Sequence, residues 1–423
     1  MKMTMTKNRW VILSAIFFAA VSLRIGGNII REKAFFHKPL LLSGDAYVKN
    51  FGCDSMWYDG TAKAFLKGMG ISSVGLSWSN ERQMLGQCAW VDYKKIDDIY
   101  YAHKAVPPLY PLFLALCYYL FGINTVAYFL PHIILSSLTC ILVYLLGEEI
   151  YNDRKIALTG ALATAFYPDL IFWTYQVRTE TLFIFLIVLG FWLLVRGNAR
   201  KSSLFILMSG VPFGLAALTR GVFIPFIPLL FLWQMFSSKN GGRKTVIASL
   251  AMILVIFLVL LPWCARNLLV FNKFTPFCDE VYAFLFPAGA NMEDRANTLC
   301  RMNDSLISRV TAFIMNDPGS YILSCWERFV MFWSPYTVHM KNIAKLYKGL
   351  AWVAIFPLAF FGIVLSRKIW RRSGLIIMFI FYHALIHSLS CVDSGLVYRY
   401  PIIPFICIFA AYGFWTIYGK SKA

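Results

Sequence analysis

The chain contains a series of separate apolar runs, each about as long as the hydrocarbon core of a lipid bilayer is thick. Its 423 residues are 59% hydrophobic and only 14% charged, with a mean hydropathy of +0.62. Lysine, arginine, glycine and proline separate one run from the next. Because lipid offers the backbone no hydrogen-bond partners, such runs have to form helices. The sequence therefore predicts an integral membrane protein and argues against a soluble domain.

These runs predict an all-α integral membrane protein with about ten transmembrane helices. The first run follows Lys2, Lys7 and Arg9 and lacks the small-residue cleavage site of a signal peptide, so we expect an uncleaved span. The expected spans lie at roughly 10–30, 126–147, 156–175, 181–196, 203–219, 222–237, 245–264, 346–366, 374–391 and 397–418.

The net charge of +19 is concentrated in short loops beside the apolar runs. Basic loops alternate with loops that hold only Arg178, Arg220 and Asp393. The positive-inside rule then predicts a multi-pass protein of the plasma (inner) membrane with both termini in the cytoplasm. The same placement argues against nucleic-acid binding. The basic loop residues are Arg9, Arg154, Lys155, Arg196, Arg200, Lys201, Lys239, Arg243, Lys244, Arg367, Lys368, Arg371, Arg372, Lys420 and Lys422.

The topology divides the chain into three parts. A transmembrane module over 1–264 includes a long outer loop at 31–125, an outward region covers 265–345, and C-terminal transmembrane helices cover 346–423. The stretch 106–122 is short and opens with two prolines, so we expect an amphipathic juxtamembrane or re-entrant helix. The stretch 321–338 carries Glu327 and Arg328 and predicts an interfacial helix.

Cys53, Cys88, Cys278 and Cys300 lie in the two outward segments, where the compartment permits disulfides. One interpretation is two local pairs, Cys53 with Cys88 and Cys278 with Cys300, and the other is four free thiols. Both interpretations stay open at the level of the sequence.

An acidic residue opens a short helical pattern in the first outer loop. Asp54, Tyr58, Ala62 and Leu66 recur every four residues, and Gly68 and Gly70 end the pattern. This spacing predicts one stripe of a helix that glycine stops. An Asp at a helix start is often an N-cap, so capping is one role for Asp54 and chemistry the other.

Six motifs in order resemble the C-type (GT-C) membrane glycosyltransferases, in particular the branch of protein mannosyltransferases and lipid A aminoarabinose transferases. The resemblance covers residues 10 to 418 and departs from the family pattern at Ser55 and over 265–345. The motifs are the Asp54 pattern, PPLYP at 107–111 with FG at 121–122, TE at 179–180, LAALTR at 215–220, PWCARN at 262–267 and YRYPIIP at 398–404.

The resemblance implies an outer-face enzyme that moves a sugar from a polyprenyl-phosphate donor to an acceptor hydroxyl. In that family the loop Asp is catalytic, so Asp54 is expected to be the general base of an inverting transfer. Glu180 is expected to be the second acidic residue, which orients the acceptor or a cation, although a helix N-terminus also favours an exposed Glu. Asp169, Asp45 and Asp59 are weaker candidates.

Cations are expected to bind the donor phosphate, because arginine suits bidentate contacts to phosphate oxygens. Arg399 is the first candidate, with Arg266 and Arg220 in support and Lys104 before the proline pair. Tyr58 belongs to the same expected substrate site. The alternative for each cation is an interfacial anchor whose head reaches the headgroup region.

No cofactor is expected to be required. A divalent metal is possible but not indicated, because the outer loop lacks a paired DxD, and His383 and His387, four residues apart, show no third ligand. Two other functions are alternatives: a transporter or flippase of lipid-linked sugars, and a polysaccharide polymerase or ligase. The sequence specifies neither the hexose or pentose nor the acceptor, which could be a glycolipid, a cell-wall polymer or a protein.

Overall fold

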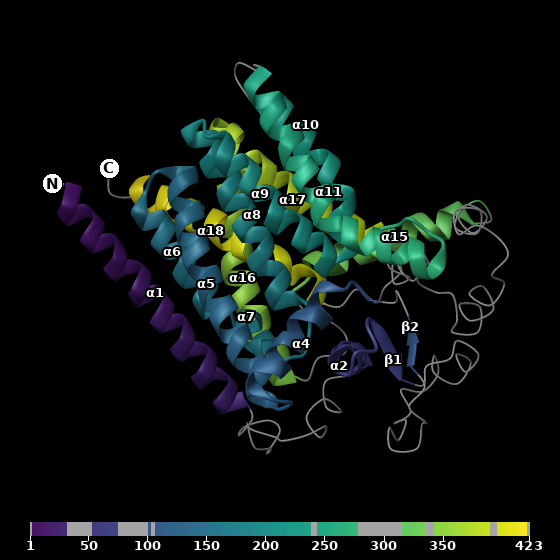
Figure 1. Cartoon of the computed structure of the whole chain (residues 1–423). Helices are drawn as coiled ribbons and strands as arrows, with labels where there is room; N and C mark the ends of the chain where they lie inside the picture. The colour runs from purple at the N-terminus through teal and green to yellow at the C-terminus, as the bar shows by residue number, and fades with distance from the viewer. Residues whose placement is uncertain are drawn as a thin grey trace.

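The computed structural model of the chain is a bundle of long helices with smaller elements at one side (Figure 1). It describes residues 2–31, 53–74, 100–102, 106–237, 243–277, 315, 317–335, 342–389 and 396–420. The expected helical membrane architecture is confirmed.

The helices of the N-terminal half are α1 (Lys2–Arg31), α2 (Cys53–Leu66), α4 (Leu109–Phe121), α5 (Thr125–Tyr151), α6 (Arg154–Phe166), α7 (Pro168–Phe172), η5 (Trp173–Tyr175), α8 (Glu180–Arg200) and α9 (Ser203–Thr219). Those that follow are η6 (Gly221–Phe226), α10 (Ile227–Ser237), α11 (Arg243–Phe271), α15 (Pro318–Trp333), α16 (Asn342–Leu365), η7 (Ser366–Ile369), α17 (Trp370–Leu389), η8 (Leu396–Ile402) and α18 (Ile403–Lys420). Two strands, β1 (Ser72–Val74) and β2 (Tyr100–Ala102), pair antiparallel.

Six helical segments of the described chain are long and apolar enough to cross a membrane. A seventh is the bent pair of Arg154–Phe166 and Pro168–Tyr175, where the chain turns by 56°. Helices α9 and α10 are apolar but shorter than that test requires. Each of the ten expected spans falls on a helical segment, while the count of ten crossings stays a prediction.

Small residues let the long helices approach closely. A Cβ atom added at Gly160 of α6 would lie 3.2 Å from the Cα of Ile408 on α18. Gly210 and Gly214 of α9 face α11 in the same way, since added Cβ atoms would lie 2.7 Å from the Met252 carbonyl oxygen and 2.8 Å from Val259. The tightest crossing joins α16 to α18, where Gly362 and Gly413 each lie against the backbone of the other helix.

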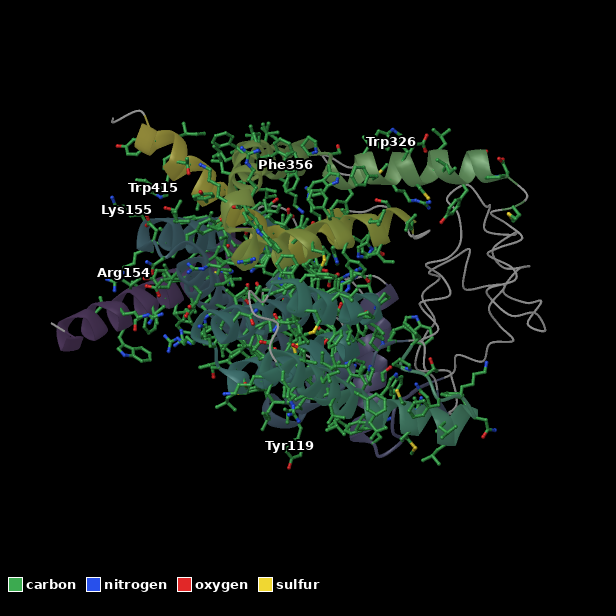
Figure 2. All side chains as sticks on the ribbon, turned by 90° about the horizontal axis from the view of Figure 1, so that it is seen from above. Tyr119, Arg154, Lys155, Trp326, Phe356 and Trp415 are labelled. Carbon is green, nitrogen blue, oxygen red and sulfur yellow. The ribbon has the colours of Figure 1, made fainter. Side chains whose placement is uncertain are left out.

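Basic loop residues gather at one end of the bundle. Glu148 at the end of α5 binds Arg9 at 2.7 Å and Arg154 at 3.6 Å, and Glu149 binds Arg196. Lys155 lies over the ring of Trp415 on α18, 5.4 Å from its centroid (Figure 2). The two chain termini lie at this same end (Figure 1). That this end faces the cytoplasm stays a prediction.

The opposite end of the bundle carries α2, β1, β2 and α4 (Figure 1). Helix α2 ends where the sequence predicts, because Gly68 and Gly70 adopt positive φ angles of 80° and 66° that other residues disfavour. Helix α4 buries Tyr110 and Leu114 against its neighbours. Its Tyr119 is 77% exposed and points away from the bundle, as a juxtamembrane helix requires (Figure 2).

Helix α15 lies beside α17 with one face uncovered. Arg328 donates from Nε to the Ser388 carbonyl oxygen at 2.9 Å and is buried. Leu323 and Trp326 on the other face are 58% and 62% exposed, and Figure 2 shows Trp326 on the outer side of the helix. An apolar face beside a membrane bundle is typical of an interfacial helix. The predicted amphipathic helix is therefore present, over Pro318–Trp333 rather than 321–338.

We predict that Gly362→Ala destabilises the protein by more than about 3 kcal/mol, because the new methyl group would overlap the Phe409 carbonyl oxygen. Gly419→Ala on α18 is the matched control, since its new Cβ would meet nothing within 4 Å. The melting temperatures of both variants are measured by thermal unfolding in detergent. Equal melting temperatures for the two would show that α16 and α18 do not cross here.

Sidedness gives a second prediction. Asn152→Cys, in the α5–α6 turn, should react with a membrane-impermeant maleimide only from the cytoplasmic side. Lys273→Cys, after α11, should react only from outside; both positions are exposed in the structure. Both variants are made in a chain in which serine replaces every native cysteine that reacts with the maleimide. Reaction of both variants from the same side would contradict the predicted topology.

Candidate functional site

A buried ion pair lies at the end of the bundle near α2 and α4. Arg220 donates from Nη1 to Oε1 of Glu180 at 2.8 Å, and their side chains are 14% and 4% exposed. The same nitrogen lies 3.3 Å from Oγ1 of Thr179. The second Glu180 oxygen, Oε2, is buried and has no hydrogen-bond partner among the described residues. This oxygen is a free acceptor beside a fixed cation.

The local sequence explains how the two residues meet. Glu180 begins α8, after the chain bends through η5, so the helix N-terminus favours its negative charge. Arg220 follows the last residue of α9 and has an extended backbone, with φ −143° and ψ 113°. Because α8 and α9 are antiparallel neighbours joined by a tight turn, the start of one lies beside the end of the other.

Aromatic rings surround the Arg220 guanidinium. Its carbon lies 6.0 Å from the centroid of Phe183 and 5.8 Å from that of Tyr398. His387 stacks on the Tyr398 ring with centroids 4.5 Å apart, and His383 Nε2 lies 2.9 Å from the Tyr398 carbonyl oxygen. The two histidines therefore support Tyr398. The described residues contain no group of three or more potential metal ligands.

Helix α2 approaches this pair through two tyrosines. Tyr58 is buried and packs edge-on against Tyr110 of α4, with ring centroids 5.0 Å apart. Tyr110 lies within electrostatic range of Glu180, and Tyr58 within that of Arg220. Residues four apart share one face of a helix, so position 54 lies on the same face of α2 as Tyr58.

The side chains of two expected site residues lie outside the described part of the structure. Asp54 lies in the first turn of α2, as the sequence predicts, but its side chain lies outside the described residues. Lys104 lies wholly outside them, as do Cys88, Cys278 and Cys300. The roles of Asp54 and Lys104, and the cysteine pairings, stay predictions.

Arg266 lies close to α2 but away from the Glu180–Arg220 pair. Its Nη2 donates to the Ile71 carbonyl oxygen at 2.9 Å, in the segment between α2 and β1. Its guanidinium lies 5.0 Å from the ring centroids of both Trp263 and Phe271. Arg266 thus connects the end of α11 to the segment after α2, and it is partly exposed.

Arg399, the first cation expected from the sequence, lies in a different environment. It is 1% exposed, donates from Nη1 to the carbonyl oxygens of Phe332 and Ser334 at 3.2 and 2.7 Å, and lies 3.7 Å from the Trp352 centroid. These contacts bind η8 to α15 and α16. The described structure brings Glu180, Arg220 and Tyr58 together but places Arg399 in this neighbouring cluster.

A second buried ion pair completes that cluster. Asp169 at the helix break is 1% exposed, binds Lys348 of α16 and accepts a hydrogen bond from the Tyr400 hydroxyl at 3.2 Å. Lys348 also lies 4.9 Å from the Phe172 centroid. Sequence reasoning gave Asp169 a weak role and missed Lys348, because nothing in the linear order indicates that these residues meet.

The comparisons with known proteins agree with this architecture. A family model described as dolichyl-phosphate-mannose-protein mannosyltransferase matches residues 105–265. The archaeal oligosaccharyltransferase AglB from Archaeoglobus fulgidus, solved with an inhibitory peptide and a dolichol-phosphate, superposes over 97% of this chain with a TM-score of 0.58 and 13% identity. The chain has the fold of the C-type membrane glycosyltransferases.

A second solved structure with this GT-C fold is similar to the same extent. ArnT from Cupriavidus metallidurans, bound to undecaprenyl phosphate, superposes over 97% of this chain with a TM-score of 0.56 and 13% identity. The chain covers 50% of AglB and 60% of ArnT, so it spans about half the length of these solved proteins. No curated protein sequence gives a significant match. The fold that the sequence resemblance implies is confirmed.

The Glu180–Arg220 pair predicts strong coupling between its members. Arg220→Met should lower the free energy of unfolding by about 3–5 kcal/mol, because it leaves a buried carboxylate without its cation. Adding Glu180→Gln should recover much of that loss, since the remaining groups are then neutral. Chemical unfolding of the two single variants and the double variant measures the coupling. Additive losses would show that the residues do not interact.

Proposed function

We propose that this protein is a glycosyltransferase that moves a sugar from a polyprenyl-phosphate-linked donor to an acceptor hydroxyl on the extracytoplasmic face. The observation that carries the proposal is the buried Glu180–Arg220 pair beside α2, within a GT-C fold. AglB and ArnT were solved with dolichol-phosphate and undecaprenyl phosphate, and lipid phosphates of that class are the donor carriers proposed here.

Asp54 is the general base in this proposal. The acceptor oxygen attacks the anomeric carbon, the bond from that carbon to the phosphate oxygen breaks, and the phosphate keeps the electron pair. The acceptor proton passes to the Asp54 carboxylate. Attack opposite the leaving group inverts the configuration at the anomeric carbon. Support comes from the position of Asp54 on α2, one turn before Tyr58 and on the same face.

Glu180 orients the acceptor. Its Oε1 is held by Arg220, while Oε2 is buried without a partner in the described part of the chain. A carboxylate oxygen of this kind accepts a hydrogen bond from a substrate hydroxyl or holds a cation. Arg220 compensates the negative charge of Glu180 in this buried setting.

The departing phosphate needs positive charge close to it. Arg220 and Arg266 are the partly exposed arginines near α2, and Lys104 lies on the same outer segment. Arg399 is committed to main-chain carbonyls and Trp352, so its part in donor binding is to hold η8 in place. The acceptor is a glycolipid, a cell-wall polymer or a protein.

Replacement of Asp54 tests the proposal. Asp54→Asn should leave expression and donor binding near the wild-type level and lower turnover by about 10²–10⁴-fold, because the amide cannot take the acceptor proton. The assay measures transfer in membranes that contain a radiolabelled polyprenyl-phosphate sugar. Turnover equal to wild type would assign Asp54 to helix capping.

Asp59→Asn is the matched control on the same helix. Asp59 is buried, accepts a hydrogen bond from the Tyr118 hydroxyl at 2.6 Å and pairs with Lys63 at 2.7 Å. We expect its turnover to stay within about threefold of wild type, because the asparagine side-chain oxygen can still accept the Tyr118 hydrogen bond. An equal loss in both variants would indicate damage to α2 rather than loss of a base.

A further inference from the structure

A buried arginine in the first span has no acidic partner. Arg24 lies in α1, within the candidate span Arg9–Ile30, and is 0% exposed. Its Nε donates to Ser136 Oγ at 2.7 Å, Nη1 to the Ala20 carbonyl oxygen at 3.1 Å, and Nη2 lies 3.4 Å from Cys140 Sγ. All three partners are neutral groups, so its charge is not compensated within the described residues.

The arginine remains charged under these conditions. A guanidinium cannot be deprotonated in proteins, so burial does not remove the charge as it would for a lysine. A buried charge without a partner costs far more than an unmet hydrogen bond. Elsewhere in the bundle Arg220 is met by Glu180, and Lys348 by Asp169. Arg24 has three hydrogen bonds but, unlike Arg220 and Lys348, no opposite charge beside it among the described residues, so an added anion would be favourable there.

A small cavity with a mixed polar and apolar lining lies next to Arg24. Residues from α1, α5, α6, η5 and α8 line it, and it has room for about one water-sized molecule. A wholly apolar cavity would stay dry, but four of the eight residues that line this one carry hydroxyl groups and a fifth is Arg24. The lining residues used here are Arg24, Ser136, Thr139, Thr164, Trp173 and Thr181.

Hydrogen-bond directions identify the free donors. Thr139 and Thr164 donate to the carbonyl oxygens of Leu135 and Gly160, each at 2.9 Å, so their hydrogens are used. Ser136 accepts from Arg24, and its own hydrogen has no acceptor among the described residues. A guanidinium has five N–H donors, of which the printed contacts of Arg24 use three. Two N–H groups and one O–H remain.

We infer that this cavity binds a small monovalent anion, of which chloride is the physiological example. The anion would neutralise Arg24 and accept hydrogen bonds from its remaining N–H groups and from Ser136. Water alone would satisfy hydrogen bonds but leave the charge, and a phosphate is too large for a cavity of this size. One lining residue, Thr181, directly follows Glu180 in α8.

Bromide and chloride are the probes. The full chain in detergent should melt about 2–4 °C higher in a chloride or bromide salt than in an isethionate salt of equal ionic strength, because bound ligand stabilises the folded state. Anomalous diffraction from crystals in bromide should show a peak within hydrogen-bond distance of the Arg24 guanidinium. Equal melting temperatures with water alone in the cavity would overturn the inference.

Two variants separate binding from general destabilisation. Ser136→Ala removes a donor to the anion and should raise the halide concentration needed for half of the stabilising effect by about tenfold. Thr139→Val is the control, since the Thr139 hydrogen is already used by Leu135, and its halide dependence should match wild type. The readout is the concentration dependence, which a loss of packing does not shift. Identical halide dependence in both variants would contradict the assigned donors.

Discussion

A charged group inside a membrane bundle is stable only where an opposite charge or several hydrogen bonds meet it, and this requirement determines how the interior is arranged. Glu180 and Arg220 meet across the antiparallel ends of α8 and α9. Asp169 at the helix break meets Lys348 of α16. Arg399 has two carbonyl oxygens and an indole ring as its partners. The C-terminal helices are thereby fixed to the N-terminal ones by polar contacts as well as by packing.

The same requirement connects the fold to its chemistry. Removing Arg220 from Glu180 would leave a carboxylate in a low-dielectric site, so the pair is formed before any substrate arrives. Such preorganised charge costs no rearrangement at the moment of reaction. Tyr58 of α2 packs against Tyr110 of α4, and this contact holds α2 near the ion pair.

Much of the helical architecture could be predicted from the sequence, because run length and loop charge are local properties. The end of α2 at Gly68 and the juxtamembrane helix α4 follow from glycine and proline chemistry in the same way. The Asp169–Lys348 pair could not be predicted, since it depends on which helices are neighbours. The pairing of β1 with β2 was also missed, because strands of three residues give no periodic signal.

The candidate site was predictable only in part, for a related reason. Two separate sequence motifs mark Glu180 and Arg220 as expected site residues, but only the three-dimensional contacts show that they form a pair. A third motif equally selected Arg399, which the fold binds into a structural cluster. Family patterns record which residues are retained and do not separate catalytic from supporting roles.

A structure of the protein with bound undecaprenyl phosphate tests the central claim most directly. We expect phosphate density within hydrogen-bond distance of Arg220 or Arg266, on the side of the bundle where α2 packs. The prenyl chain should extend between helices. Phosphate bound instead at the end that carries Arg9 and Arg154, or no phosphate near α2, would contradict it.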